Sequence, residues 1–161
     1  YDAGWLSTYL YRDIGGKYKM VIWDFNSACD NYQQTTTQPQ RFRMHQGVWY
    51  YMLIKDEYFV NQVIDRYRSL RESYLNDDYL TDYIDSVVEY LGPAIDRNFE
   101  VWGDTFQEFT PLKPASRNPT SHEEALEQMK DFIYHRGAWM DENIDILLQY
   151  CHESKVKKFN H

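Results

Sequence analysis

Apolar residues recur every three or four positions through most of the chain after residue 47, which is typical of amphipathic helices. The clearest stripe lies over residues 57–75 and consists of Phe59, Val63, Tyr67, Leu70 and Tyr74. Asp56, directly before it, is a good N-cap because a short carboxylate accepts a backbone N–H of the first turn. The pattern predicts a helix over 57–75, preceded by a shorter helical segment over 47–55.

Two more helical regions follow in the pattern. One begins near Asn76 or Asp77 and continues to about residue 102, and Gly92-Pro93 should kink or break it because proline lacks the backbone N–H. After a loop with several prolines, residues 121–124 read Ser-His-Glu-Glu, a capping box that predicts a helix start. Asp141 is expected to cap a last short helix. The proline loop at 110–120 is the one candidate for a domain boundary.

The apolar stripes are more typical of a hydrophobic core than of a cofactor pocket. The residues predicted to lie in the core are Trp23, Trp49, Phe59, Val63, Leu70, Ile84, Val87, Leu91, Phe132 and Leu147.

The N-terminal part has a different period. Over residues 7–23 a Thr- and Tyr-rich segment is followed by an alternating one, and Gly15-Gly16 between them is a turn signal. This predicts a β-hairpin, which needs packing against the helices or against other structure, since a lone hairpin is marginal in water. The expected fold class is therefore mainly α, with an N-terminal β-hairpin followed by four or five helices.

Composition limits the classes of function. The chain has 161 residues, enough for one domain, and a net charge of −8 with pI near 5.0, which argues against a nucleic-acid partner. No apolar run approaches the roughly 18 residues of a membrane span. Cys29 and Cys151 show no zinc spacing, and whether they pair is open. The first residue is Tyr rather than Met, so we expect further sequence upstream.

Two aspartates flank the predicted hairpin. Asp2 lies just before it and Asp24 just after it, so the returning chain should bring both carboxylates to its open end. Phosphoryl transfer uses such a pair, one carboxylate orienting the attacking hydroxyl and the other holding Mg²⁺. Spacing alone leaves a structural interpretation open. A calcium loop starting at Asp24 is disfavoured, because Cys29 and Thr35 replace the Gly and Glu of an EF-hand.

The amino-acid sequence of this segment is more specific than the spacing of its two aspartates. Asp2 is followed by a Tyr-rich strand that ends in Arg12-Asp13, by Gly15-Gly16-Lys17, and by Trp23-Asp24-Phe25-Asn26-Ser27-Ala28. The segment resembles the CotH family, atypical kinases related to the spore coat protein H. Later features that fit are Trp49, Leu53, Arg66, Leu70-Arg71 and Arg136-x-x-Trp139-Met140-Asp141.

The resemblance implies that residues 1–161 form a partial CotH kinase-like domain, the C-lobe-like half of an atypical kinase fold. Its parts would be a metal-binding hairpin (1–32), a polar loop (33–46) and a helical body (47–161). It further implies transfer of phosphate from ATP to protein side chains with Mg (or Mn). Asp2 matches the catalytic aspartate, Asp24 the metal-binding one, and Asn26 the second polar position of the metal motif.

There are departures and alternatives. Ser7 stands where kinase catalytic loops carry a metal-binding Asn, and the ATP-binding Lys and Glu are expected upstream, so this segment alone should be inactive. Arg41 and Arg43 could grip phosphate or an acidic substrate, although loop arginines are usually just solvated. The resemblance implies a protein substrate or a coat or surface protein as partner, at a bacterial spore coat or cell surface. The alternative is a non-catalytic scaffold or adhesion module of the same family.

Overall fold

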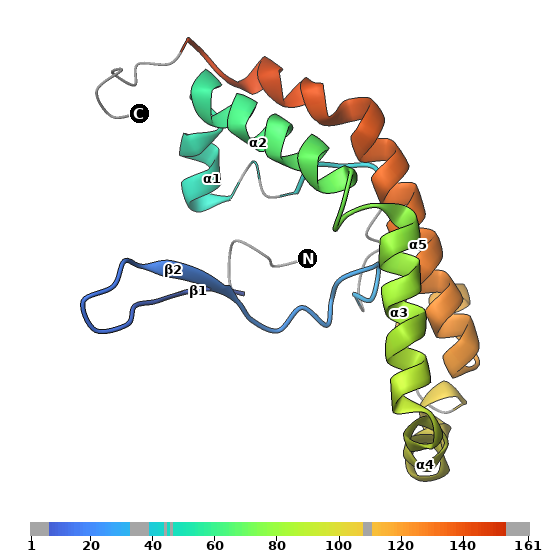
Figure 1. Ribbon diagram of the computed structural model, residues 1–161. Coiled ribbons are helices and arrows are strands. Elements are labelled where there is room, and N and C mark those ends of the chain that lie inside the picture. Colours follow the sequence, from blue (N-terminus) through green and yellow to red (C-terminus); the bar gives the residue numbers. More distant parts are fainter. Residues whose placement is uncertain (1–6, 33–38, 44, 46, 108–110, 154–161) are drawn as a thin grey trace.

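The chain forms a β-hairpin followed by a body of five α-helices (Figure 1). The computed structural model describes residues 7–32, 39–43, 45, 47–107 and 111–153. The strands and α-helices are β1 (Thr8–Tyr11), β2 (Lys19–Ile22), α1 (Val48–Leu53), α2 (Glu57–Arg71), α3 (Asp77–Leu91), α4 (Pro93–Trp102) and α5 (His122–Asn143). Three 3-10 helices are η2 (Gly103–Phe106), η3 (Ala115–Arg117) and η4 (Ile144–Tyr150). The predicted fold class, mainly α with an N-terminal hairpin, is confirmed.

The hairpin is antiparallel, with Thr8 opposite Ile22 and Tyr11 opposite Lys19. Gly15 has a positive φ of 73°, which only glycine adopts at low cost, and the turn is closed by the Gly16 N–H donating to the Asp13 carbonyl at 2.9 Å. The ribbon projects away from the helices (Figure 1), so most side chains on both of its faces are exposed.

Trp23 is a correction to the predicted core. Its ring packs edge-on against Tyr9, with centroids 6.1 Å apart, but the side chain is 65% exposed. The alternation of the hairpin marks one face as apolar, but no described helix covers that face.

The hydrophobic core lies where α2, the C-terminal half of α5 and η4 meet (Figure 1). Its buried residues are Ile54, Val60, Ile64, Ile144 and Leu147. The helix pair α3–α5 extends from this core towards α4 (Figure 1), and α3, which contacts α5 and α4, has no buried residue.

The predicted core residues divide accordingly. Leu147 is buried, and Phe59, Val63, Leu70, Ile84 and Phe132 are half-buried. Trp49, Val87 and Leu91 are exposed, so their placement in the core was wrong. The spacing of apolar residues in the sequence identified the apolar face of α3, but a face is buried only where another element covers it.

The predicted helix ends largely agree with the structure. The Asp56 carboxylate caps α2 by accepting the Phe59 N–H at 3.1 Å, and the Asn76 side chain caps α3. Gly92, with φ of 45°, separates α3 from α4, and Pro93 occupies the first turn of α4, where its missing N–H costs nothing.

The start of α5 is a variant of the predicted capping box. Ser121 Oγ accepts the Glu124 N–H at 3.1 Å, while the Glu124 carboxylate accepts from Thr120, at 2.7 Å from the N–H and 2.6 Å from the hydroxyl. Asp141 is not the cap of a last helix, which is a further correction. It lies within the last turn of α5, and its carboxylate accepts hydrogen bonds from Tyr67 and Arg71.

Candidate functional site

Asp24 follows directly after the second strand of the hairpin. The Trp23 N–H donates to the Ser7 carbonyl at 3.2 Å, which closes the hairpin at its open end. Asp24 then takes a positive φ of 53°, a left-handed conformation that Asp and Asn tolerate better than other residues. The turn leaves Asp24 exposed on the edge of a large cavity.

The segment after Asp24 is held by its own hydrogen bonds. The Ala28 N–H donates to the Phe25 carbonyl at 3.0 Å, and the Asn31 N–H donates to the Ala28 carbonyl at 2.9 Å. The Asn31 side chain also donates to the Asn26 carbonyl at 2.8 Å. These consecutive turns fix the backbone that carries Asp24 and Asn26.

Arg117 attaches this segment to the rest of the molecule. Its Nε and Nη2 donate to the two carboxylate oxygens of Asp30 at 3.0 and 2.9 Å, and Nη2 also donates to the Tyr32 carbonyl at 3.1 Å. The Arg117 side chain is only 10% exposed. The proline-containing segment before α5 therefore positions the turns that follow Asp24.

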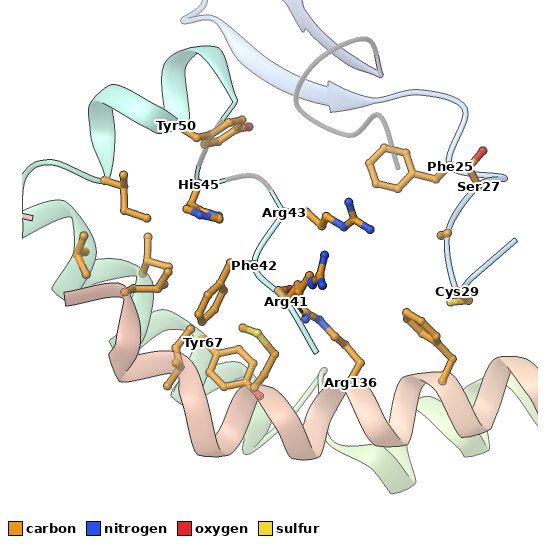
Figure 2. Close-up of a pocket in the computed structure, with 18 of the residues that line it drawn as sticks. Phe25, Ser27, Cys29, Arg41, Phe42, Arg43, His45, Tyr50, Tyr67 and Arg136 are labelled. Atoms are coloured by element: carbon orange, nitrogen blue, oxygen red, sulfur yellow. Dashed lines mark hydrogen bonds between the residues drawn. The ribbon is translucent and has the colours of Figure 1, made fainter. Parts of the chain in front are cut away.

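The cavity bordered by Asp24 has a volume of 640 Å³ (Figure 2). The segment with Phe25, Ser27 and Cys29 forms one wall, and the core side chains of α2, α5 and η4 form the opposite wall. Arg41 and Arg43 lie between these walls, on the loop that precedes α1. Most of the lining is apolar, and the cationic groups are gathered in one part of it.

Arg136 is a residue of this cavity to which the sequence assigned no role. It lies on α5, and its Nη1 donates to the carbonyls of Pro39 and Arg41, both at 2.6 Å. Its guanidinium also stacks on the Trp139 ring, 5.3 Å from the centroid. Arg136 thereby holds the loop carrying Arg41 and Arg43 against α5. The motif Arg136-x-x-Trp139 drew attention to this residue in the sequence, but the motif does not reveal which loop the Arg136 side chain contacts.

Burial favours the neutral form of two other groups in the cavity. It lowers the pKa of His45, although a backbone hydrogen bond at Phe42 opposes this, and it raises the pKa of the Cys29 thiol. His45 Nδ1 is buried and has no hydrogen-bond partner within the described part of the chain. Cys29 and Cys151 are both free in this structure.

The structure brings only some of the predicted site residues together. Asp24, Arg41 and Arg43 line the same cavity. Asn26 lines a neighbouring cavity of 560 Å³, on the other side of a wall that both cavities share. Asp2, and with it the predicted approach of Asp2 to Asp24, lies outside the described residues. Within those residues, no group of three or more His, Cys, Asp or Glu side chains could hold a metal ion.

A leading hairpin that ends in Trp23-Asp24-Phe25-Asn26, followed by a mainly helical body, is the arrangement that the resemblance to the CotH family implied. The chain belongs to the CotH family: residues 1–140 match the family model described as CotH kinase protein. Comparisons with curated proteins and with solved structures gave no match. None of the described helices combines the length and apolar character needed to cross a membrane.

Proposed function

We propose that the full-length protein transfers phosphate from ATP to protein side chains, with Asp24 holding Mg²⁺ (or Mn²⁺) and Asp2 orienting the acceptor hydroxyl. The observation that carries the proposal is the position of Asp24. It follows the hairpin in a left-handed turn and borders a cavity whose lining includes Arg41, Arg43 and Arg136. Membership of the CotH family supports the same reaction class.

The residues present fit a nucleotide-bound Mg²⁺ better than an all-protein metal cage. Mg²⁺ usually keeps several waters and binds one or two carboxylates together with substrate phosphates. The exposed carboxylate of Asp24, with Asp2 as the second carboxylate that we propose, would be such a set. When bound, the ion neutralises the charge on the phosphates. Asn26 opens onto the neighbouring cavity, so its role here is to orient a water or to support the turn.

Ser7 adds little as a ligand. It is 4% exposed at the base of the hairpin, and its carbonyl accepts the Trp23 N–H. A buried residue in this position secures the end of the hairpin, and the metal is left to the carboxylates.

The test is Asp24→Asn in the full-length protein, assayed with Mg²⁺, labelled ATP and candidate protein acceptors. Asn tolerates the same left-handed backbone, so the change removes charge without straining the turn. We expect phosphate transfer to fall by about a hundredfold or more, because charge neutralisation and positioning supply most of the rate. Asp65→Asn, at an exposed aspartate on α2 outside the cavity lining, is the matched control and should keep full activity. Undiminished transfer by Asp24→Asn would contradict the assignment.

A non-catalytic scaffold or adhesion module is the second candidate, and the surface of the hairpin favours it. Leu10, Met20, Ile22 and Trp23 are each more than half exposed. Such a surface suits contact with another protein or with a further part of the same one. A full-length protein that binds its partners but transfers no phosphate, whether or not Asp24 is intact, would support this candidate.

A further inference from the structure

Arg136 differs from the other two well-buried arginines of the described body. Arg71 is paired with Asp77 and Asp141, and Arg117 is paired with Asp30. Arg136 contacts only backbone carbonyls and the Trp139 ring, and within the described residues it has no carboxylate partner. Charges removed from water are normally paired, so Arg136 calls for an anion from outside these residues.

Neighbouring charged groups add to the positive charge around Arg136. Burial lowers the pKa of Arg136, and the charge of nearby Arg43 lowers it further, although Tyr67 opposes the effect. Arg41 and Arg43 line the same cavity (Figure 2), and among its described lining residues Asp24 is the one carboxylate. The cavity thus gathers positive charge in a chain whose net charge is −8.

The rest of the cavity suits an apolar group attached to that anion. Its deep wall is formed by Ile54, Val60, Val63, Ile144 and Leu147 from the core. Arg136 Nε and Nη2 make no hydrogen bond within the described part of the chain, so both can donate to an oxyanion. Guanidinium groups match phosphate geometry and bind it through paired hydrogen bonds.

We propose that Arg41, Arg43 and Arg136 form a phosphate subsite that binds a phosphorylated residue of the polypeptide substrate, with an apolar neighbour of that residue on the core wall. The proposal rests on the proposed function, which places the nucleotide phosphates at Asp24 on the edge of the same cavity. The acceptor polypeptide is then bound by the three arginine side chains. A substrate that already carries phosphate is preferred, so one transfer promotes the next on the same chain.

The test measures binding without metal, so that it does not depend on transfer. The full-length protein in EDTA is titrated with a phosphoserine peptide that has leucine next to the phosphoserine, with its unphosphorylated form, with ATP and with inorganic phosphate. We expect the phosphopeptide to bind more tightly than its unphosphorylated form and than inorganic phosphate. Combined Arg41→Gln and Arg43→Gln should weaken it by about tenfold or more, as expected for lost charge-assisted hydrogen bonds. Arg136→Lys, which keeps the charge but not the paired donors, should also weaken it.

Two controls separate the possible explanations. A double variant of the exposed residues Arg66→Gln and Arg97→Gln, on α2 and α4 and outside the cavity lining, removes the same charge and should leave binding unchanged. Asp24→Asn should retain phosphopeptide binding even where it abolishes transfer, so failure of the proposed function and failure of the subsite are distinguishable. The subsite is wrong if the two double variants weaken binding equally, if the unphosphorylated peptide binds as well, or if Arg41→Gln and Arg43→Gln weaken ATP binding and leave phosphopeptide binding unchanged.

Discussion

Arg117 and Asp30 form a two-pronged ion pair that joins segments 87 residues apart in the sequence. The pair connects η3, before α5, to the turn that follows Trp23-Asp24-Phe25-Asn26. Arg117 also donates to the carbonyls of Lys113 and Tyr32, so one side chain ties together two pieces of irregular backbone. The position of Asp24 relative to the helices therefore depends on a residue far from it in the sequence.

Replacing Arg117 with Met should destabilise the protein. The change leaves the Asp30 carboxylate without its main cationic partner, and Asp30 retains only 26% side-chain exposure. We expect a loss of about 2–3 kcal/mol in the free energy of unfolding, below the full effect of a buried pair because water still reaches Asp30. Urea unfolding measures it, with Arg97→Met as the surface control. A double-mutant cycle with Asp30→Asn should show coupling, and purely additive losses would mean that the ion pair contributes nothing.

Replacing Gly137 with Ala should destabilise the protein, although Gly→Ala within a helix usually stabilises it. Within a helix, Gly→Ala normally stabilises by about 1 kcal/mol. At Gly137 on α5, however, an added Cβ would lie 2.8 Å from Asp77 Oδ1 and 3.0 Å from Arg71 Nη1. Because the ion pair holds both atoms in place, Gly137→Ala should lower the unfolding free energy by about 1–2 kcal/mol.

Gly103→Ala is the matched control for that change. A Cβ there meets nothing within 4 Å, and φ is −60°, so the substitution should be neutral or stabilising. Thermal unfolding of the two variants gives the comparison. If Gly137→Ala is as stable as Gly103→Ala, the α2–α3 corner is not closely packed on α5.

The carboxylate of Asp141 should make stability depend on pH in the acid range. Burial opposes its ionisation, but hydrogen bonds from Arg71 and Tyr67 outweigh this and lower the pKa of Asp141 below the ordinary 3.8. A pKa that is lower in the folded state gives stability that is present above pH 3.8 and is lost as pH falls through the folded pKa.

Asp141→Asn should therefore lower stability at neutral pH, by about 1–2 kcal/mol given the partial exposure of the site. It should also flatten the loss of stability on acidification. Urea midpoints from pH 7 to pH 2 measure both effects, with Asp65→Asn as an exposed control on α2. An unchanged acid slope would show that Asp141 is not linked to folding.

Asp24→Asn should leave the stability of this chain nearly unchanged. Asp24 is exposed, and Asn tolerates its left-handed backbone, so neither burial nor strain changes. Thermal unfolding of the wild-type and variant chains should give midpoints that agree within about 2 °C. A large loss of stability would identify Asp24 as a structural turn residue and would remove the support for a metal site.

The sequence alone determined which segments are regular and where most of the helices begin. Glycine at positions 15 and 92, and the short polar side chains of Asp56, Asn76 and Ser121, act on backbone within a few residues, so local chemistry was sufficient. The motif around Asp24 was likewise found from the sequence, because its residues are contiguous.

Tertiary structure alone decided which apolar faces are covered and which charged groups meet. The exposure of Trp23 and Leu91 depends on neighbouring elements, and periodicity contains no information about them. Asp141 could be mistaken for a helix cap because its partners, Tyr67 and Arg71, are about 70 residues away. The position of Arg136 in the cavity with Arg41 and Arg43 was hidden from the sequence for the same reason. Packing of α5 against a distant loop brings their charges together, and spacing along the chain does not encode that contact.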